Sequence, residues 1–188
     1  QMLLEFNASD ELCKNFTTQL GFKASHSSRK STLESNPILR ALSIEGAEKD
    51  SSFKYGEILF RPLAISLQKI QYEFNGLKHP GKEIFVDLGS GTGKPCIAAA
   101  LMYPFKKVIG IEVLKDLCSL SSKLKLRYDN YFKTNKTKTE VEYICEDIVR
   151  TTCWYDADIV FCNSLIFNKE LCNKIADMAV NLKPGAFF

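Results

Sequence analysis

The sequence predicts an α/β domain with a doubly wound, mainly parallel sheet and a small helical accessory segment at its amino-terminal side. Two observations support this fold class. Short apolar segments that suit buried strands alternate along the chain with longer segments of helical periodicity. In addition, one of these strands leads directly into a glycine-rich turn and a helix, an arrangement typical of parallel sheets that bind a nucleotide-type ligand.

The glycine-rich turn is the most distinctive stretch of the chain. Residues 84–88 are apolar without alternation, as expected of a strand buried on both faces. Pro95 then suits the first turn of a helix, where its missing N–H is not needed, and an Ala-rich run continues that helix to Met102. Between strand and helix, three glycines give the backbone freedom and remove side chains that would block a ligand: Gly89, Gly91 and Gly93.

Residues 1–54 are expected to form the accessory segment. Their pattern predicts a short amphipathic helix over residues 9–20, a mobile surface loop near residues 24–35 and a second helix over about residues 36–45. Such a segment suits a packing or oligomer arm as well as it suits a part of a substrate site. Residues 55–188 are expected to form the main domain.

The main domain opens with a helix over residues 57–74, in which apolar residues recur in steps of three and four from Phe60 to Phe74. Beyond the glycine-rich turn, further strands are expected at residues 107–112, 141–145 and 159–163, and helices at residues 116–132 and 169–182. A Lys-Pro-Gly turn follows, and a fifth strand begins at Phe188. We therefore expect the last strands of the sheet to lie outside this sequence.

Composition and charge restrict the classes of protein to consider. The 188 residues carry a net charge of +3, which is too mild to require a nucleic-acid partner, although contact with nucleic acid stays open. No apolar run approaches the roughly 20 residues that span a bilayer, and no basic-then-apolar leader follows Met2. We expect a soluble intracellular protein, in the nucleus or the cytoplasm, without membrane contact.

The seven cysteines favour reduced thiols over a metal site. Their number is odd, none is spaced as C-x-x-C, and only two histidines are available to complete a zinc site. We expect no metal. Four cysteines fall within apolar strand or helix patterns, where a reduced thiol behaves as a small hydrophobic side chain: Cys96, Cys118, Cys145 and Cys162.

The spacing of the glycines indicates the kind of ligand. A dinucleotide fingerprint requires a third glycine where this chain has Lys94, so a nicotinamide cofactor is disfavoured. The pattern is instead D-x-G-x-G-x-G, with Asp87 two positions before Gly89. A carboxylate there can meet a cationic or amino group, whereas it would repel a pyrophosphate.

Two more acidic positions follow the next two strands. Ligands of open parallel sheets bind at the carboxyl ends of strands, so Glu112 is expected beside the turn, where it can accept hydrogen bonds from ribose hydroxyls. Asp147 and Ile148 follow the third strand, where the acid suits an adenine amino group and the apolar side chain suits its ring. Taken singly, each acid is more often a helix cap or a solvated carboxylate. Their shared position favours a ligand site.

These segments resemble the class I S-adenosylmethionine-dependent methyltransferases over roughly residues 80–188. A narrower resemblance, to the histone lysine methyltransferases of the disruptor-of-telomeric-silencing type, is carried by residues 55–57, 85–91 and 160–164 with Phe167. It implies a Rossmann-like fold and S-adenosylmethionine as cofactor, with S-adenosylhomocysteine as product. It also implies a protein lysine as methyl acceptor, in a histone or nucleosome.

The resemblance further implies roles for particular residues. Tyr55 and Glu57 would close over the cofactor, and Glu112 would bind its ribose. The implied cofactor-binding set is Tyr55, Glu57, Asp87, Gly89, Ser90, Gly91, Gly93, Lys94, Glu112, Val113, Asp147, Ile148 and Asn163, and the implied catalytic set, facing the methyl group and the acceptor, is Asn163, Tyr55 and Phe167.

Methyl transfer from a sulfonium is an in-line displacement that depends mainly on positioning, so the chain needs no acid–base dyad for it. A lysine acceptor, with an ordinary pKa of about 10.4, must first lose its proton, and a dry aromatic channel lowers that pKa. Phe161, Phe167 and Tyr55 are candidates for such walls, with core packing as the alternative, above all for Phe161.

Two other functions stay open at this stage. One is a non-catalytic S-adenosylmethionine-binding module that regulates a partner, and the other is a methyltransferase acting on RNA or a small molecule. The chain differs from the family pattern at Ile58, Leu59, Lys94 and Ser164, which keeps these alternatives in view. The absence of an Asn/Asp-Pro-Pro-aromatic motif after the fourth strand favours a protein substrate over a nucleic-acid base or a small amine.

Overall fold

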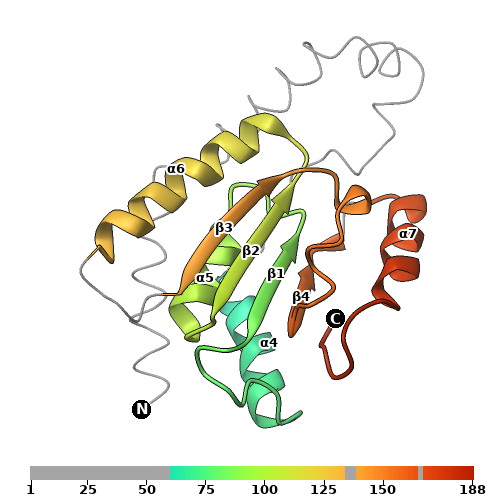
Figure 1. The fold of residues 1–188 in the computed structure, drawn as a ribbon, viewed down its shortest axis with the longest axis horizontal. Coiled ribbons are helices and arrows are strands. Elements are labelled where there is room, and N and C mark those ends of the chain that lie inside the picture. The colour runs from blue at the N-terminus through green and yellow to red at the C-terminus, as the bar shows by residue number, and fades with distance from the viewer. Residues whose placement is uncertain (1–59, 134–138, 165–166) are drawn as a thin grey trace.

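The computed structural model describes residues 60–133, 139–164 and 167–188. Their strands form one parallel sheet in the order β3-β2-β1-β4 (Figure 1). The chain starts in the middle of the sheet at β1, moves outward to β2 and β3, and then returns to the other side of β1 with β4. The strands are β1 (Ile84–Leu88), β2 (Lys107–Glu112), β3 (Glu140–Cys145) and β4 (Ile159–Cys162).

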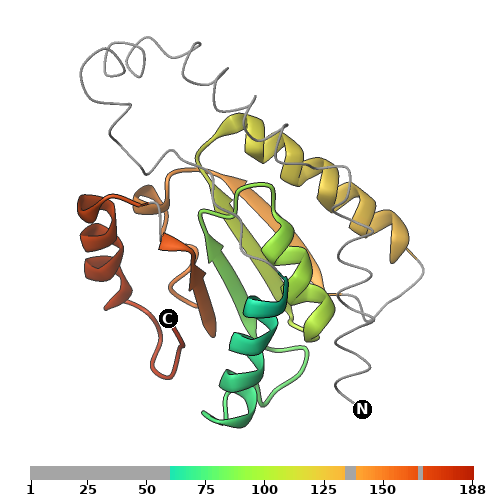
Figure 2. The same cartoon turned by 180° about the vertical axis from the view of Figure 1, so that it is seen from behind.

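Helices cover both faces of this sheet. Three of them, α4, α5 and α6, lie on the face turned toward the viewer in Figure 2, while α7 lies on the opposite face. A short 3-10 helix, η2, follows β3. The helical elements are α4 (Phe60–Tyr72), α5 (Lys94–Met102), α6 (Lys115–Tyr131), η2 (Ile148–Arg150) and α7 (Lys169–Ala179).

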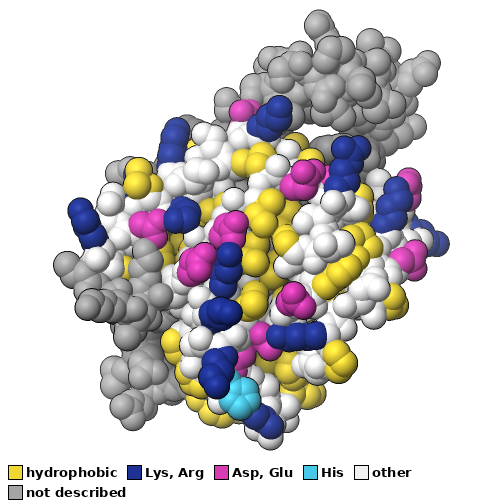
Figure 3. All heavy atoms as spheres, in the orientation of Figure 1, with side chains coloured by type: hydrophobic (Ala, Val, Ile, Leu, Met, Phe, Trp, Pro, Cys, Tyr) yellow, Lys and Arg dark blue, Asp and Glu magenta, His cyan; other side chains and the backbone are white. Residues whose placement is uncertain are grey.

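Alternation along the strands divides the interior into two cores. Phe85 and Val108 point to the face of α4, α5 and α6, whereas the next residues, Val86 and Ile109, point to the face of α7. All four are buried, which explains why β1 and β2 show no polar alternation in the sequence. On the face shown in Figure 3, hydrophobic side chains lie in patches between charged side chains of both signs.

The described elements agree closely with the prediction. β1 and β2 have the predicted bounds, and the chain returns near its end to the free side of β4, where Phe187 forms a parallel bridge with Ile159. The helix predicted to reach residue 182 ends at Ala179 instead. Tighter bonds replace the helical ones there, because the N–H of Leu182 donates to the carbonyl of Ala179.

The helix expected to reach residue 74 ends earlier. Phe74 closes the apolar series that predicts this helix, but α4 ends at Tyr72 and Phe74 is 65% exposed. The chain turns away there because Asn75 and Leu77 adopt left-handed backbone conformations, with φ of 54° and 55°. The expected elements before residue 60, including the loop near residues 24–35, lie outside the described residues.

The structure also corrects the expectation that the core cysteines are all reduced. Cys118 in α6 and Cys145 at the end of β3 form a disulfide, with their Cα atoms 5.7 Å apart. Cys145 lies beside Glu112 in the sheet, on the face that α6 covers, so the fold brings together two thiols 27 residues apart in sequence. Cys96 and Cys162 are free, as predicted.

Candidate functional site

The glycine-rich turn, residues 89–93, joins β1 to α5 at the carboxyl ends of the strands (Figure 1). All three glycines have positive φ values, 80° for Gly89, 56° for Gly91 and 84° for Gly93, which explains why this turn needs glycine. The N–H groups of Gly89 and Ser90 both donate to the carbonyl of Ile111 at 2.9 Å. The beginning of the turn is thereby fastened to the end of β2.

Glu112 connects the last residue of β2 to the middle of the turn. Its Oε2 accepts a hydrogen bond from the N–H of Gly91 at 2.9 Å, while Oε1 accepts from Val113 at 2.9 Å and Leu114 at 2.8 Å. The carboxylate is therefore beside the turn, as the sequence predicted. A carboxylate offers about four acceptor positions, so one stays available for a ligand hydroxyl. Burial raises the pKa of Glu112, and these N–H donors oppose that rise.

Asp87 is the second buried acid of the site. Only 1% of its surface is exposed. Burial, reinforced by the nearby charge of Glu112, raises its pKa to about 8, and the thiol of Cys96, 3.8 Å from Oδ2, acts weakly in the opposite direction. Two acids that resist joint ionisation in one place favour a cationic ligand, because a positive charge would stabilise both carboxylates.

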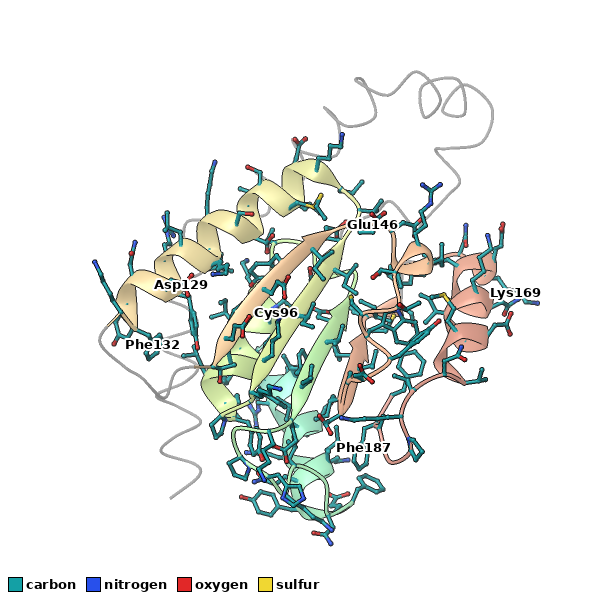
Figure 4. The ribbon with its side chains drawn as sticks, viewed as in Figure 1. Cys96, Asp129, Phe132, Glu146, Lys169 and Phe187 are labelled. Carbon is teal, nitrogen blue, oxygen red and sulfur yellow. A yellow bond between two sulfur atoms is a disulfide. The ribbon has the colours of Figure 1, made fainter. Side chains whose placement is uncertain are left out.

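The residues after β3 complete the edge of the site. The N–H of Glu146 donates to the carbonyl of Glu112 at 3.0 Å, and Figure 4 shows Glu146 at the tip of β3. Asp147 Oδ1 accepts from the N–H of Val149 at 3.1 Å and caps η2, an element that the sequence analysis missed. Ile148 is buried. Contacts of Asp147 and Ile148 with an adenine stay predictions.

Phe167 and Asn163 approach from the β4 side. A side-chain carbon added to Gly89 would lie 2.8 Å from Cζ of Phe167, so this ring rests directly against the turn. Asn163 follows Cys162, the residue paired with Leu88 just before the turn, and is half-buried. Phe161 is half-buried, packs on Phe85 with ring centroids 6.4 Å apart, and is paired with Asp87 in the sheet. Its role as a wall of the site stays a prediction.

The other predicted site residues lie in different environments. The Ser90 hydroxyl is buried beneath the turn, next to Gly110, and has no hydrogen-bond partner among the described residues. Lys94 begins α5 and is half-buried, whereas the Val113 side chain is 51% exposed at the rim. Tyr55 and Glu57 lie outside the described residues.

Tyr143 is a residue of this region that the sequence analysis missed. Its hydroxyl donates a hydrogen bond of 2.7 Å to the carbonyl of Gly93, the last glycine of the turn. No motif marks it, because it lies inside β3 and 50 positions away from Gly93 along the chain. Within the described ranges, no three His, Cys, Asp or Glu side chains are grouped so as to hold a metal ion.

Comparison with known families identifies the chain. The model of the family described as "Histone methylation protein DOT1" matches residues 38–187, most of the sequence. The chain belongs to this family. Its domain has the Rossmann-like, doubly wound fold that the sequence predicts, since its four described strands are parallel and their order reverses at β1.

Two curated relatives are named "Histone-lysine N-methyltransferase, H3 lysine-79 specific". The protein of Kluyveromyces lactis is 29% identical over 148 residues, which are 72% of this chain and 24% of that protein. The protein of Eremothecium gossypii is 28% identical over 147 residues, 72% of this chain and 23% of that protein. The chain thus matches about a quarter of the length of these relatives.

Several solved structures with a similar fold are described as methyltransferases. One, an S-adenosylmethionine-dependent methyltransferase from Clostridium acetobutylicum, has a TM-score of 0.48 and 18% identity, covering 69% of this chain and 49% of that one. Another, the amino pentose methyltransferase CalS10 from Micromonospora echinaspora with bound cofactor, has a TM-score of 0.45 and 19% identity, covering 69% and 48%.

Proposed function

We propose that this domain binds S-adenosylmethionine at the glycine-rich turn and transfers its methyl group to a lysine amine of a histone. One observation carries the proposal: in a chain of the DOT1 family, two buried acids, Asp87 and Glu112, meet at a turn of three left-handed glycines. The cofactor is positively charged at its sulfonium and amino groups and carries a free ribose. Both features suit this pair of carboxylates.

The residues of the site fit this cofactor on two counts. The pKa of Asp87 is raised first by burial and second by the nearby charge of Glu112, and a bound cation would stabilise its ionised form. The single acceptor position left on Glu112 suits a ribose hydroxyl. At the methionine end, the cofactor would be lined by Asp87, the glycines and Lys94, with Ser90 below the turn. The adenine would be surrounded by Val113, Asp147 and Ile148. Tyr55 and Glu57 would close over the cofactor.

When bound, the cofactor supplies an electrophilic methyl group, and the chain supplies the surroundings for its transfer. Asp87 holds the cationic end in place, which fixes the direction of attack. Phe167, whose ring already lies against Gly89, excludes water from the acceptor side. A neutral lysine is favoured in such an apolar setting, because desolvation lowers the pKa of its ammonium group. Asn163 orients the acceptor through its amide.

The acceptor class follows from the family and its named relatives. Those relatives act on lysine 79 of histone H3 by name, and we assign this chain a histone lysine, within the nucleosome, as its acceptor class. A nuclear location accompanies such a substrate. Among the described helices, none combines the length and the hydropathy that crossing a membrane requires.

Methyl-labelled cofactor tests the acceptor. The protein is incubated in turn with nucleosomes, free histones, RNA and a cell extract, and mass spectrometry locates the modified residue. We expect label on a histone lysine. Label on RNA or on a small molecule alone would replace the histone by that acceptor, and cofactor binding with no labelled product would leave a regulatory module.

A substitution tests the site itself. Asp87→Ala removes the acid that is proposed to hold the cationic end, so calorimetry should show at least about thirtyfold weaker cofactor binding. The matched control is Asp156→Ala, which removes an exposed acid near the amino end of β4, away from the turn, and should bind normally. Equal affinities of the two variants would contradict the site.

A further inference from the structure

Tyr143 lies in the row of the sheet directly below the glycine-rich turn. Asp87 of β1 pairs with Gly110 of β2, and Gly110 pairs with Tyr143 of β3, so all three occupy the same face. The middle residue has no side chain. A carbon added to Gly110 would meet Cδ1 of Tyr143 at 2.7 Å, which shows that the tyrosine ring lies across the glycine toward the turn.

The far end of the ring reaches Gly93. The Tyr143 hydroxyl donates to the Gly93 carbonyl at 2.7 Å, and the ring also fills the place where a side chain of Gly93 would stand. Gly93 caps the amino end of α5, and the same carbonyl accepts the N–H of Ile97 at 3.2 Å. The phenol therefore holds the peptide group through which the turn enters the helix.

The three glycines are thus fastened at three separate points. The carbonyl of Ile111 holds Gly89, and the carboxylate of Glu112 holds Gly91, so β2 secures the first part of the turn. Tyr143 secures the last part from β3. A run of glycines loses much conformational entropy on being fixed, so each fastening reduces what a ligand must contribute to order the turn.

We propose that Tyr143 is a positioning residue for the cofactor: through its hydrogen bond to Gly93 it keeps the glycine-rich turn and the start of α5 in the ligand-binding conformation. This inference rests on the proposed cofactor site. Tyr143 acts through the turn and not by transferring the methyl group, so its loss raises the amount of cofactor needed and leaves the rate at saturation unchanged.

The test compares two tyrosine-to-phenylalanine substitutions in the chain of 188 residues. Tyr143→Phe removes one hydroxyl below the turn. The control, Tyr128→Phe, removes a hydroxyl from a buried tyrosine of α6 that donates to the carbonyl of Thr139 at 3.2 Å, just before β3 begins. Thermal unfolding measures the stability lost in each variant, and calorimetry measures the dissociation constants of S-adenosylmethionine and S-adenosylhomocysteine.

We expect Tyr143→Phe to bind both forms of the cofactor about three- to tenfold more weakly. The KM for S-adenosylmethionine should rise by the same factor, and kcat should be unchanged. Tyr128→Phe should bind with wild-type affinity at a comparable thermal shift. Wild-type affinity in Tyr143→Phe would overturn the inference, as would an equal loss in both variants, because the effect would then be one of general stability.

Amide hydrogen exchange separates this inference from the proposed function. In the free protein, Tyr143→Phe should speed the amide exchange of residues 91–97, apart from Pro95, by about three- to tenfold relative to wild type and leave β2 unaffected. Unchanged exchange there would overturn the positioning role even if the cofactor binds. Wild-type protein that binds neither form of the cofactor would instead overturn the proposed function, while the exchange result still decides whether Tyr143 fastens the turn.

Discussion

Asp87, the acid proposed to hold the cationic end of the cofactor, opposes the stability of its own fold. Asp87 is the second-last residue of β1 and only 1% exposed, and the charge of the neighbouring Glu112 opposes its ionisation. Under the proposed function, this cost is the consequence of placing two acids where a cation binds. In the free protein the cost falls on the folded state alone, since the unfolded chain solvates both carboxyls.

The sign of this cost defines a pH dependence. The folded state keeps the Asp87 proton up to a pKa of about 8, whereas the ordinary value is 3.8. Between these values the unfolded state releases a proton that the folded state retains, so this residue lowers the free energy of unfolding progressively as pH rises. Asp87→Asn removes that loss. Urea unfolding should show a variant more stable than wild type by several kcal/mol at pH 8 and little different near pH 4.

Asp87→Asn should also bind the cofactor more weakly. We therefore expect a variant that is more stable than wild type but less active. Parallel pH profiles of the two proteins would contradict the assignment, because the difference between them must grow from about pH 4 to about pH 8. Asp156→Asn serves as the control, because it replaces an exposed aspartate outside the site by the same amide.

At the scale of elements, α6 is tied to β3 beside the site. The disulfide between Cys118 and Cys145 ends one residue before Glu146, whose N–H reaches the carbonyl of Glu112. The Cys118 sulfur also lies 3.3 Å from that carbonyl oxygen. The disulfide therefore links the end of β3, where the adenine is expected, covalently to α6, while the end of β2 contacts the same region through the carbonyl of Glu112.

The disulfide gives a prediction that depends on the redox conditions. Cys118→Ser opens a link between residues 27 positions apart, which corresponds to about 3 kcal/mol of stability in the chain-entropy model. Chemical unfolding without reductant should show that loss, and with excess reductant the variant and wild type should become nearly equal. Cys153→Ser, which changes an exposed free thiol, should match wild type in both cases. If Cys118→Ser stays less stable than wild type in excess reductant, the lost stability comes from side-chain packing and not from the disulfide.

The elements also show where sequence patterns suffice and where they do not. Largely apolar runs predicted the bounds of β1 and β2, because strands buried on both faces show no alternation of apolar and polar residues. The glycine spacing and the acids at strand ends predicted the turn with Asp87 and Glu112 around it. The bond from Tyr143 to Gly93 and the Cys118–Cys145 link escaped prediction, since both depend on register between β2 and β3, which no local pattern contains.

At the scale of the whole molecule, the site joins the strands that hold the fold together. Asp87 belongs to β1, Glu112 to β2, and Asp147 follows β3, so a ligand that touches all three bridges neighbouring strands of one sheet. Helices α4 to α6 and the core beneath them rest on the same strands. Separation of these strands destroys the site, so global unfolding must release the ligand.

Cofactor binding should therefore raise the unfolding temperature of the whole domain. At a concentration of about 100 times the dissociation constant, binding to the folded state alone contributes about 2.7 kcal/mol, which corresponds to a rise of about 5–10 °C for a chain of this size. Differential scanning calorimetry should show one cooperative transition moving upward with S-adenosylmethionine. Asp87→Ala should lose the shift and Asp156→Ala should keep it. A wild-type transition that does not move would show that S-adenosylmethionine does not bind preferentially to the folded domain, which would contradict the proposed site.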